Sequence, residues 1–426
     1  MKGKIEKVRG TRDFYPEEKR IQNFIFDVWR DVALKYGYEE MDGPLIEPIE
    51  LWHKKSGEEI ESQMYTLVDK GGRKLVIRPE MTPTLARMVA QRQRELTKPI
   101  KWFSIQRFWR YEKPQSGRLR EFWQINIDVV GTESILADAE ITATAIEIML
   151  RLGFTEKEFV VRINNRRLLG GILLQLGVQK NRIIELCRII DKKDKVAERN
   201  FRQMLADFGL DEKTISKLND VLESEDYLEK VDEKKLSEEG RQGLYELKQL
   251  IKYMKSFGLW KYCKLDLSMV RGIDYYTGNV MEVFDISKEF RAIAGGGRYD
   301  DLVAVVGGER CPGVGYAMGD VVLELFMRKK GKMPKLEKEI DFFIATTSES
   351  LAEKAVEIAQ LLRKKYNVDI DLMNRKLAKQ LKYADSVGAK KIVIVGEEEL
   401  KQNKVKIKDM KTGKEELVLI EELKMI

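Results

Sequence analysis

The chain has very few of the residues that build disulfide frameworks or metal centres. Its 426 residues include three cysteines, Cys187, Cys263 and Cys311, and a single histidine, His53. The cysteines are odd in number and far apart in the sequence, so neither a disulfide framework nor a zinc site is indicated. One histidine cannot build a histidine-based catalytic or metal site. We therefore expect other side chains to carry any chemistry, and we expect a reducing, cytoplasmic location.

Long apolar runs are also missing from the sequence. No stretch approaches the about 20 consecutive apolar residues that a membrane-spanning helix needs, so we expect no membrane association. Residues 1–4 lead directly into charged residues and do not resemble the apolar core of a signal peptide. The formal net charge of +7 fits a nucleic-acid partner, but a charged, solvated surface explains it nearly as well.

The length of the chain exceeds what one hydrophobic core usually organises, so two or three domains are expected. A basic link at residues 329–334 precedes a compact pattern of predicted strands at 340–345, 368–372 and 391–395, which alternate with helices. Such alternation predicts a parallel or mixed sheet covered on both faces. This part of the chain lacks a Gly-rich phosphate loop. We assign residues 334–426 to a C-terminal α/β domain.

Residues 165–258 have a different character from the segments on either side. They are predicted as helices rich in Leu, Ile, Lys and Glu, separated at Gly209, Gly240 and Gly258. Because the candidate site residues lie on both sides, we interpret this stretch as a helical insertion within a domain of residues 1–330. Lys and Arg are plentiful there, but Glu and Asp are too, so charge alone does not establish binding.

The first predicted helix opens at Pro16 and ends at Gly37. Its apolar positions fall on one stripe; they are Ile21, Phe24, Ile25, Val28 and Val32. The stripe is explained as readily by core packing as by a subunit interface.

A polar strand face is the first sign of a site. Residues 108–112 and 120–124 are predicted as two strands joined by a basic loop, so Arg110 and Glu112 should share one face, opposite Trp109 and Tyr111. Further along, the polar side chains after Phe122 are Gln124, Asn126 and Asp128, and the apolar ones are Trp123, Ile125, Ile127 and Val129. A half-solvated sheet shows the same alternation. The mixture of Arg, Glu, Gln, Asn and Asp, with hardly any Lys or Thr, favours a walled site.

The run 271–276, Arg-Gly-Ile-Asp-Tyr-Tyr, places a guanidinium and two phenols beside a glycine. Arg offers a planar fork of donors that matches carboxylate or phosphate, and Tyr gives a flat apolar wall with a polar tip. One interpretation is a pocket for a small zwitterion and a phosphate. The other is a strand with one surface Arg and two half-buried tyrosines, which is the commoner case for six residues in isolation. The neighbouring polar strands favour the pocket.

Together these segments resemble the class II aminoacyl-tRNA synthetases and, among them, the histidyl-tRNA synthetases. Residues 108–124 resemble the second class II motif, and 271–276 resembles the signature of the histidine enzymes. Residues 76–82 resemble the segment that holds the amino group, and 294–300 resembles a further family block. These ordered blocks extend across nearly the whole chain, which makes a chance match implausible.

The resemblance implies an α+β catalytic domain, residues 1–330, built on an antiparallel sheet flanked by helices. Its helical insertion, residues 165–258, touches the tRNA acceptor arm in the family, and residues 334–426 match the anticodon-binding domain. The resemblance also implies a homodimer that forms through the first helix and the strand after it. The implied activity joins histidine to ATP, giving histidyl-adenylate and pyrophosphate, and then transfers histidine to the 3′ end of tRNA(His).

The same resemblance assigns roles to individual residues. Arg110 and Arg271 are the candidate catalytic cations at the α-phosphate and also contact histidine. At the histidine amino group the resemblance places Glu80, Met81 and Thr82, and at the imidazole it places Gln124, Asp128, Tyr275 and Tyr276. At ATP it places Glu112, Arg118 and Phe122 together with Arg110. At the tRNA acceptor end it places Lys113 and Gln115. Mg²⁺ is expected to bind mainly through the phosphates, so no protein ligand is assigned to it.

One motif departs from the family pattern. The last class II motif ends Gly-X-Glu-Arg, and its Arg covers the adenine, whereas Val322 occupies that position here. A weaker grip on adenine, compensation by another cation, or a non-catalytic paralogue would each follow.

Two alternative functions are therefore retained. The paralogue would be a regulatory subunit of ATP phosphoribosyltransferase, which typically lacks the anticodon-binding domain that this chain keeps. A class II synthetase for proline, glycine or threonine would share both domains but not the run 271–276.

Overall fold

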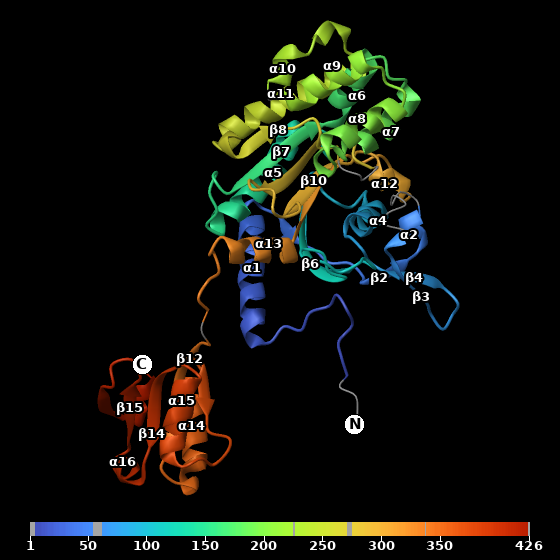
Figure 1. Cartoon of the computed structure of the whole chain (residues 1–426). Helices are drawn as coiled ribbons and strands as arrows, with labels where there is room; N and C mark the ends of the chain where they lie inside the picture. The colour runs from blue at the N-terminus through green and yellow to red at the C-terminus, as the bar shows by residue number, and fades with distance from the viewer. Residues whose placement is uncertain (1–4, 54–61, 225, 271–274, 337, 425–426) are drawn as a thin grey trace. The chain divides into compact units, whose positions relative to one another are not determined.

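The chain folds into two compact units, Met1–Met333 and Pro334–Ile426 (Figure 1). The computed structural model describes residues 5–53, 62–224, 226–270, 275–336 and 338–424. None of the helices in these ranges is long and apolar enough to cross a membrane.

The first unit is built on an eight-stranded sheet in the order β1-β5-β6-β11-β10-β9-β7-β8. The inner pairs are antiparallel, and the edge pairs β1/β5 and β7/β8 are parallel. The strands are β1 (Glu39–Glu40), β5 (Ile100–Trp109), β6 (Glu121–Val130), β7 (Phe159–Asn165), β8 (Cys263–Leu265), β9 (Asn279–Asp285), β10 (Ala294–Arg298) and β11 (Gly313–Gly319). The predicted α+β domain on an antiparallel sheet is confirmed.

Helices cover both faces of this sheet (Figure 1). One face packs into a large apolar core that includes Trp29, Ile127 and Phe326. The helices on that side are α1 (Pro16–Lys35), α5 (Ile135–Arg151) and α13 (Asp320–Lys329). The other face carries a smaller cluster with Tyr275, Tyr276 and helices α4 (Thr82–Arg92) and α12 (Leu302–Val305).

A small three-stranded sheet, in the order β2-β4-β3, leads into α4. Its elements are β2 (Ile46–Pro48), α2 (Glu50–His53), β3 (Tyr65–Val68) and β4 (Lys74–Ile77). The short connection from β4 to α4 carries Glu80 and Met81.

The alternation predicted for β6 is confirmed. Ile125, Ile127 and Val129 lie in the large core, while Asn126 and Asp128 are buried on the other face. From Ile125 to Val130, both faces of this central strand are therefore closed to water, and its polar side needs partners inside the protein.

The predicted strand at 108–112 ends earlier than expected. β5 stops at Trp109, although the Arg110 N–H still donates to the Arg120 carbonyl. The Tyr111 N–H then donates to the Gln63 carbonyl, and the Glu112 N–H turns back to the Arg110 carbonyl. Glu112 is buried and Tyr111 is 56% exposed. The Trp109 and Tyr111 rings both contact the Tyr65 ring, as alternation predicts for that pair. The shared face of Arg110 and Glu112 stays a prediction, because the strand ends before them.

The helices between β7 and β8 form one group above the sheet (Figure 1). They are α6 (Arg166–Gln175), α7 (Ile183–Ile190), α8 (Glu198–Asp207), α9 (Glu212–Glu223), α10 (Tyr227–Lys230) and α11 (Glu238–Ser256). α11 packs on both α6 and α5. A Cβ added at Gly243 would lie 2.3 Å from the Leu168 backbone nitrogen, so this glycine permits the close approach of α11 and α6.

The second unit has a five-stranded sheet in the order β13-β12-β14-β15-β16. Its elements are β12 (Ile340–Thr346), α14 (Ala352–Leu362), β13 (Val368–Ile370), α15 (Leu377–Ser386), β14 (Ala389–Val395), α16 (Glu397–Lys401), β15 (Lys404–Asp409) and β16 (Glu415–Leu419). The first three strands are parallel, and separate apolar clusters contain residues of α14 and α15. The predicted mixed sheet covered by helices is confirmed.

The glycines of β10 and β11 provide a stability test. A Cβ at Gly296 would lie 2.1 Å from the Gly315 carbonyl oxygen, whereas a Cβ at Gly319 meets nothing within 4 Å. We expect Gly296→Ala to lower the free energy of unfolding by about 1–3 kcal/mol through overpacking. Gly319→Ala is the matched control and should cost less than about 1 kcal/mol. Urea denaturation of both variants measures the difference, and equal midpoints would contradict the packing argument.

Candidate active site

Asp128 lies at the centre of the buried polar face of β6. Its carboxylate accepts a hydrogen bond from the Tyr299 hydroxyl at 2.6 Å. Gly315 pairs with Asp128 across β11, and a Cβ at that position would lie 1.9 Å from Asp128 Oδ1. The carboxylate therefore fits in the sheet because its neighbour has no side chain.

Burial changes the acid–base behaviour of this pair. Desolvation raises the pKa of Asp128 to about 7, although the hydrogen bond from Tyr299 opposes the rise. Burial and the nearby Asp128 carboxylate raise the pKa of Tyr299 well above its ordinary value. Asp128 therefore titrates near neutral pH, where its ionised form accepts hydrogen bonds and its protonated form also donates one.

A strip of buried polar atoms accompanies Asp128. Asn126 pairs with Ser104 and Gln124 pairs with Gln106 in the β5–β6 ladder. Three buried side-chain oxygen atoms of this ladder have no hydrogen-bond partner within the described residues; these are Gln124 Oε1, Asn126 Oδ1 and Ser104 Oγ. Buried polar atoms are usually satisfied, so a strip of this kind is suited to a small polar ligand or ordered water.

The segment before α4 meets the tyrosine pair. The Tyr275 hydroxyl donates to Glu80 Oε2 at 3.3 Å. Met81 is completely buried, and Thr82 begins α4. The rings of Tyr275 and Tyr276 lie 5.0 Å apart between centroids. This contact joins the segment at 76–82 to the end of the run at 271–276, as one pocket requires.

Arg110 and Phe122 lie beside this pocket. Arg110 Nε donates to the Pro79 carbonyl at 3.0 Å, and its guanidinium carbon lies 5.3 Å from the Phe122 ring centroid. Phe122 packs at a tilt against Phe108, with 6.1 Å between centroids. The arginine is therefore oriented by a backbone carbonyl and a ring face.

The loop between β5 and β6 is closed by an ion pair. Arg118 Nη2 donates to Glu112 Oε1 at 2.6 Å, and Arg118 Nε also contacts that carboxylate. Gln115 and Arg118 exchange backbone hydrogen bonds of 3.0 and 2.9 Å, with Gly117 in the left-handed region at φ 74°. The Lys113 and Gln115 side chains are exposed on this loop.

Arg271 and the three residues after it lie outside the described residues, so the catalytic role predicted for Arg271 stays a prediction. Tyr275 and Tyr276 are described, and both are buried. They precede β9 and are not part of a strand, unlike the strand-like stretch predicted for this run.

Two site residues received no role from the sequence. Tyr299 holds Asp128, and the quoted block 294–300 contained it without showing its partner. Arg78 is buried, donates to the Gly43 carbonyl at 2.7 Å and to Gln106 Oε1 at 2.8 Å, and faces the Phe108 ring. The sequence did contain a signal for Arg78, because this arginine directly follows two apolar residues of a strand.

Val322 is buried at the start of α13, beneath the tip of the β5–β6 loop. A Cβ on Gly117 would lie 3.5 Å from Val322 Cγ2. In the same helical turn, Asp320 accepts from Arg12 Nη2 at 2.6 Å and from the Trp123 backbone N–H at 3.0 Å. Arg12 is therefore a cation held at the first residue of α13.

The first unit is built on a mostly antiparallel sheet that carries these motifs, and the same chain contains a mixed α/β unit. This combination defines a class II aminoacyl-tRNA synthetase. A family model for histidyl-tRNA synthetase matches residues 10–320, and one for an anticodon binding domain matches residues 341–425. The chain belongs to the histidyl-tRNA synthetase family.

Individual relatives agree with this assignment. The chain is 40% identical to the histidine–tRNA ligase of Leptospira biflexa, over 95% of this chain and 93% of the relative. It is 38% identical to that of Pyrococcus furiosus, over 98% of each chain. The crystal structure of histidyl-tRNA synthetase from Nostoc sp. PCC 7120 superimposes with a TM-score of 0.83 at 29% identity, covering both chains completely.

A fourth comparison bears on the retained paralogue. A structure from Bacillus halodurans described as an ATP phosphoribosyltransferase regulatory subunit/histidyl-tRNA synthetase gives a TM-score of 0.77 at 23% identity, over 92% of this chain and 98% of that one. This likeness shows the common fold alone. The curated ligases, at higher identity, support the synthetase over the regulatory subunit.

The raised pKa of Asp128 predicts a pH-dependent stability. The carboxyl titrates near pH 4 in an unfolded chain and near 7 in the fold, so the folded protein binds an extra proton between these values. The free energy of unfolding contributed by this group is therefore highest below about pH 4 and decreases as the pH rises to about 7. Asp128→Asn removes this titration.

We expect the stability of Asp128→Asn, relative to the original protein, to increase by about 1–4 kcal/mol between pH 4 and pH 7. It should then stay constant above pH 7. Urea denaturation across this range measures both proteins. Parallel curves for the two would show that Asp128 does not retain its proton in the fold.

Proposed function

We propose that this protein is a histidine–tRNA ligase, which forms histidyl-adenylate from histidine and ATP and then transfers histidine to tRNA(His). The observation that carries the proposal is the buried Asp128, with a pKa of about 7, beside the strip of polar oxygen atoms on β5 and β6. A carboxylate in this position accepts a hydrogen bond from an imidazole N–H.

In the first step, the histidine carboxylate attacks the α-phosphorus of ATP, and pyrophosphate leaves. Negative charge grows on the α-phosphate oxygens, so positioned cations lower the barrier. We assign this role to Arg110 and Arg271. The attacking group is already ionised at neutral pH, so no general base is needed. The hydrogen bond from Arg110 to Pro79 supports a fixed orientation of the cation.

Histidine recognition is assigned to the other pocket residues. Glu80 and Thr82 would hold the amino group, with Met81 behind them, and Tyr275 would orient Glu80. Gln124, Asp128, Tyr275 and Tyr276 would surround the imidazole. An apolar amino acid would leave these buried polar groups without partners, which is the physical basis of steep discrimination.

ATP binding is assigned to the β5–β6 loop and Phe122. Phe122 would stack on adenine, while Arg118 would exchange part of its pairing with Glu112 for the γ-phosphate. Arg12 is our candidate for the cation that compensates for Val322, since Asp320 holds it in the same turn.

Mg²⁺ would bind mainly through the ATP phosphates. No group of three or more His, Cys, Asp or Glu side chains in the described part of the chain is arranged to hold a metal ion. Phosphate oxygens and water are the usual ligands in such a site.

We also propose the larger assembly in which this chemistry takes place. The catalytic domain spans residues 1–330, residues 165–258 are its insertion, and residues 334–426 bind the anticodon. We further propose a cytoplasmic homodimer, whose first helix lies at the interface. Lys113 and Gln115, both exposed on the β5–β6 loop, would meet the acceptor end of the tRNA.

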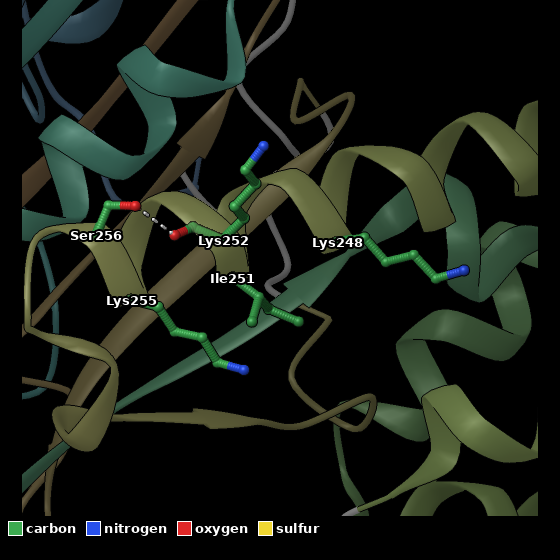
Figure 2. A pocket seen from close by; sticks show the side chains of 5 residues that line it. All are labelled: Lys248, Ile251, Lys252, Lys255 and Ser256. Atoms are coloured by element: carbon green, nitrogen blue, oxygen red, sulfur yellow. Dashed lines mark hydrogen bonds between the residues drawn. The ribbon is translucent and has the colours of Figure 1, made fainter.

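A basic groove on α11 is a second candidate tRNA contact. Lys248, Lys252 and Lys255 line a groove of about 520 Å³ together with Ile251 and Ser256 (Figure 2). The sequence from 247 to 265 contains five lysines and no Asp or Glu, and of the three lysines in the groove Lys248 pairs with Glu233 at 3.3 Å. An RNA backbone is the partner that matches this local excess of positive charge.

Amino-acid-dependent ATP–pyrophosphate exchange, measured with each of the twenty amino acids and without tRNA, tests the proposed function. We expect exchange with histidine alone, because only histidine satisfies the polar pocket. Exchange with another amino acid would keep the class of enzyme and discard the histidine specificity. If none of the twenty amino acids supports exchange although histidine still binds, the result would favour the regulatory subunit.

The groove on α11 is tested by replacing Lys248, Lys252 and Lys255 together with Gln. We expect the KM for tRNA in aminoacylation to rise about tenfold and its salt dependence to weaken, because phosphate contacts are lost. Pyrophosphate exchange does not involve tRNA and should be unchanged. Gln at Lys213 and Lys217, two exposed lysines of α9, is the matched control. An unchanged KM for tRNA in the triple variant would exclude the groove as a contact.

A further inference from the structure

Arg167 links the helical insertion to the catalytic sheet. It lies in the first turn of α6, where the chain leaves β7. One end of its guanidinium donates to Glu246 of α11 at 2.5 Å, and the other donates to Asp300, just after β10, at 3.0 Å. Both carboxylates are almost completely buried, while Arg167 is 30% exposed. A single side chain therefore connects the first and last long helices of the insertion to the sheet.

The same carboxylate of Asp300 holds the chain beside the pocket. The Thr277 hydroxyl donates to Asp300 Oδ2 at 2.9 Å, and this oxygen is also the acceptor for Arg167. The Thr277 backbone N–H donates to the Arg298 carbonyl at 2.8 Å. Thr277 directly follows Tyr275 and Tyr276, so the ion pair from the insertion ends one residue from the pocket wall.

Further buried groups make this arrangement rigid. Asn165 Nδ2 donates to Glu246 at 2.8 Å and to Asn279 Oδ1 at 2.9 Å. Asn279 in turn donates to Asp138 at 3.1 Å, and Arg298 pairs with both Asp138 and Asp300. Buried polar networks of this kind specify one arrangement when every member is satisfied. Removing the Arg167 cation would leave Glu246 and Asp300 short of a partner, which is costly for buried carboxylates.

The network lies at the histidine end of the proposed site and far from the ATP end. The register places Arg298 beside Val314 of β11, which pairs with Val129 of β6. Phe122 lies seven residues earlier on β6, or about 23 Å away along the strand. A change at Thr277 should therefore reach the histidine pocket and leave the adenine pocket intact.

We propose that Arg167 is a positioning residue for histidine: through Asp300 and Thr277 it couples the seating of the insertion to the Tyr275–Tyr276 wall of the pocket. The proposal rests on the proposed histidine-activating function. It gives the base of the insertion a role in amino-acid recognition, in addition to any contact with RNA.

Four variants of the full-length protein test this coupling: Arg167→Gln, Arg167→Lys, Thr277→Val and the double variant Arg167→Gln/Thr277→Val. In pyrophosphate exchange, we expect Arg167→Gln and Thr277→Val each to raise the KM for histidine about tenfold, with the KM for ATP changed less than twofold. Arg167→Lys should recover part of the loss, because it keeps the charge but cannot reproduce the two-ended fork. The double variant should be no worse than the more severe single variant, since both changes interrupt one connection.

Arg182→Gln is the matched control, because Arg182 is another ion-paired arginine of the insertion and lies away from this network. Its KM values should equal those of the original protein. An unchanged histidine KM in Arg167→Gln, an equal rise in both KM values, or additive effects in the double variant would overturn the proposal. Histidine binding measured by calorimetry gives the same comparison without catalysis, so it distinguishes failure of the coupling from failure of the proposed enzymatic function.

Discussion

The burial of a carboxylate on a central strand is the constraint on which the site depends. Asp128 is enclosed by sheet neighbours, so it needs both space and a hydrogen-bond partner. Gly315 provides the space on one side, and the Tyr299 hydroxyl provides the partner. The resulting pKa near 7 follows from desolvation and allows the group to accept or donate near neutral pH. The histidine recognition that we propose depends on this balance between the burial of the Asp128 carboxylate and its hydrogen bonding.

The other parts of the site reach this strand from distant segments of the chain. Glu80 and Tyr275 are 195 residues apart in sequence and share a hydrogen bond. Arg110 is tied to Pro79, which lies between β4 and α4. Each contact joins two short connections that flank strands of the fold, so the pocket is formed by loops that the sheets hold in place.

The insertion is integrated into this framework and is not a loosely attached group of helices. Close packing at Gly243 and the ion pairs of Arg167 connect α6 and α11 to the sheet. The lysines of α11 face outward into a groove, so one helix combines a buried polar anchor at Glu246 with an exposed basic surface. The RNA contact that we propose at the outer surface and the buried anchor at the inner one therefore lie on the same helix.

The sequence by itself determined the features that depend on local periodicity and on ordered motifs. These were the alternation along β6, the first helix, the mixed sheet of the second unit and the family to which the chain belongs. Tertiary structure alone decided which side chains meet. The Tyr299–Asp128 pair spans 171 residues, the bridge of Arg167 joins three separate segments, and beyond the end of β5 the Tyr111 N–H donates to the distant Gln63 carbonyl. The periodicity of a strand or helix depends on residues that are neighbours in the sequence. The burial and hydrogen bonding of a polar group depend instead on which distant parts of the chain pack against it.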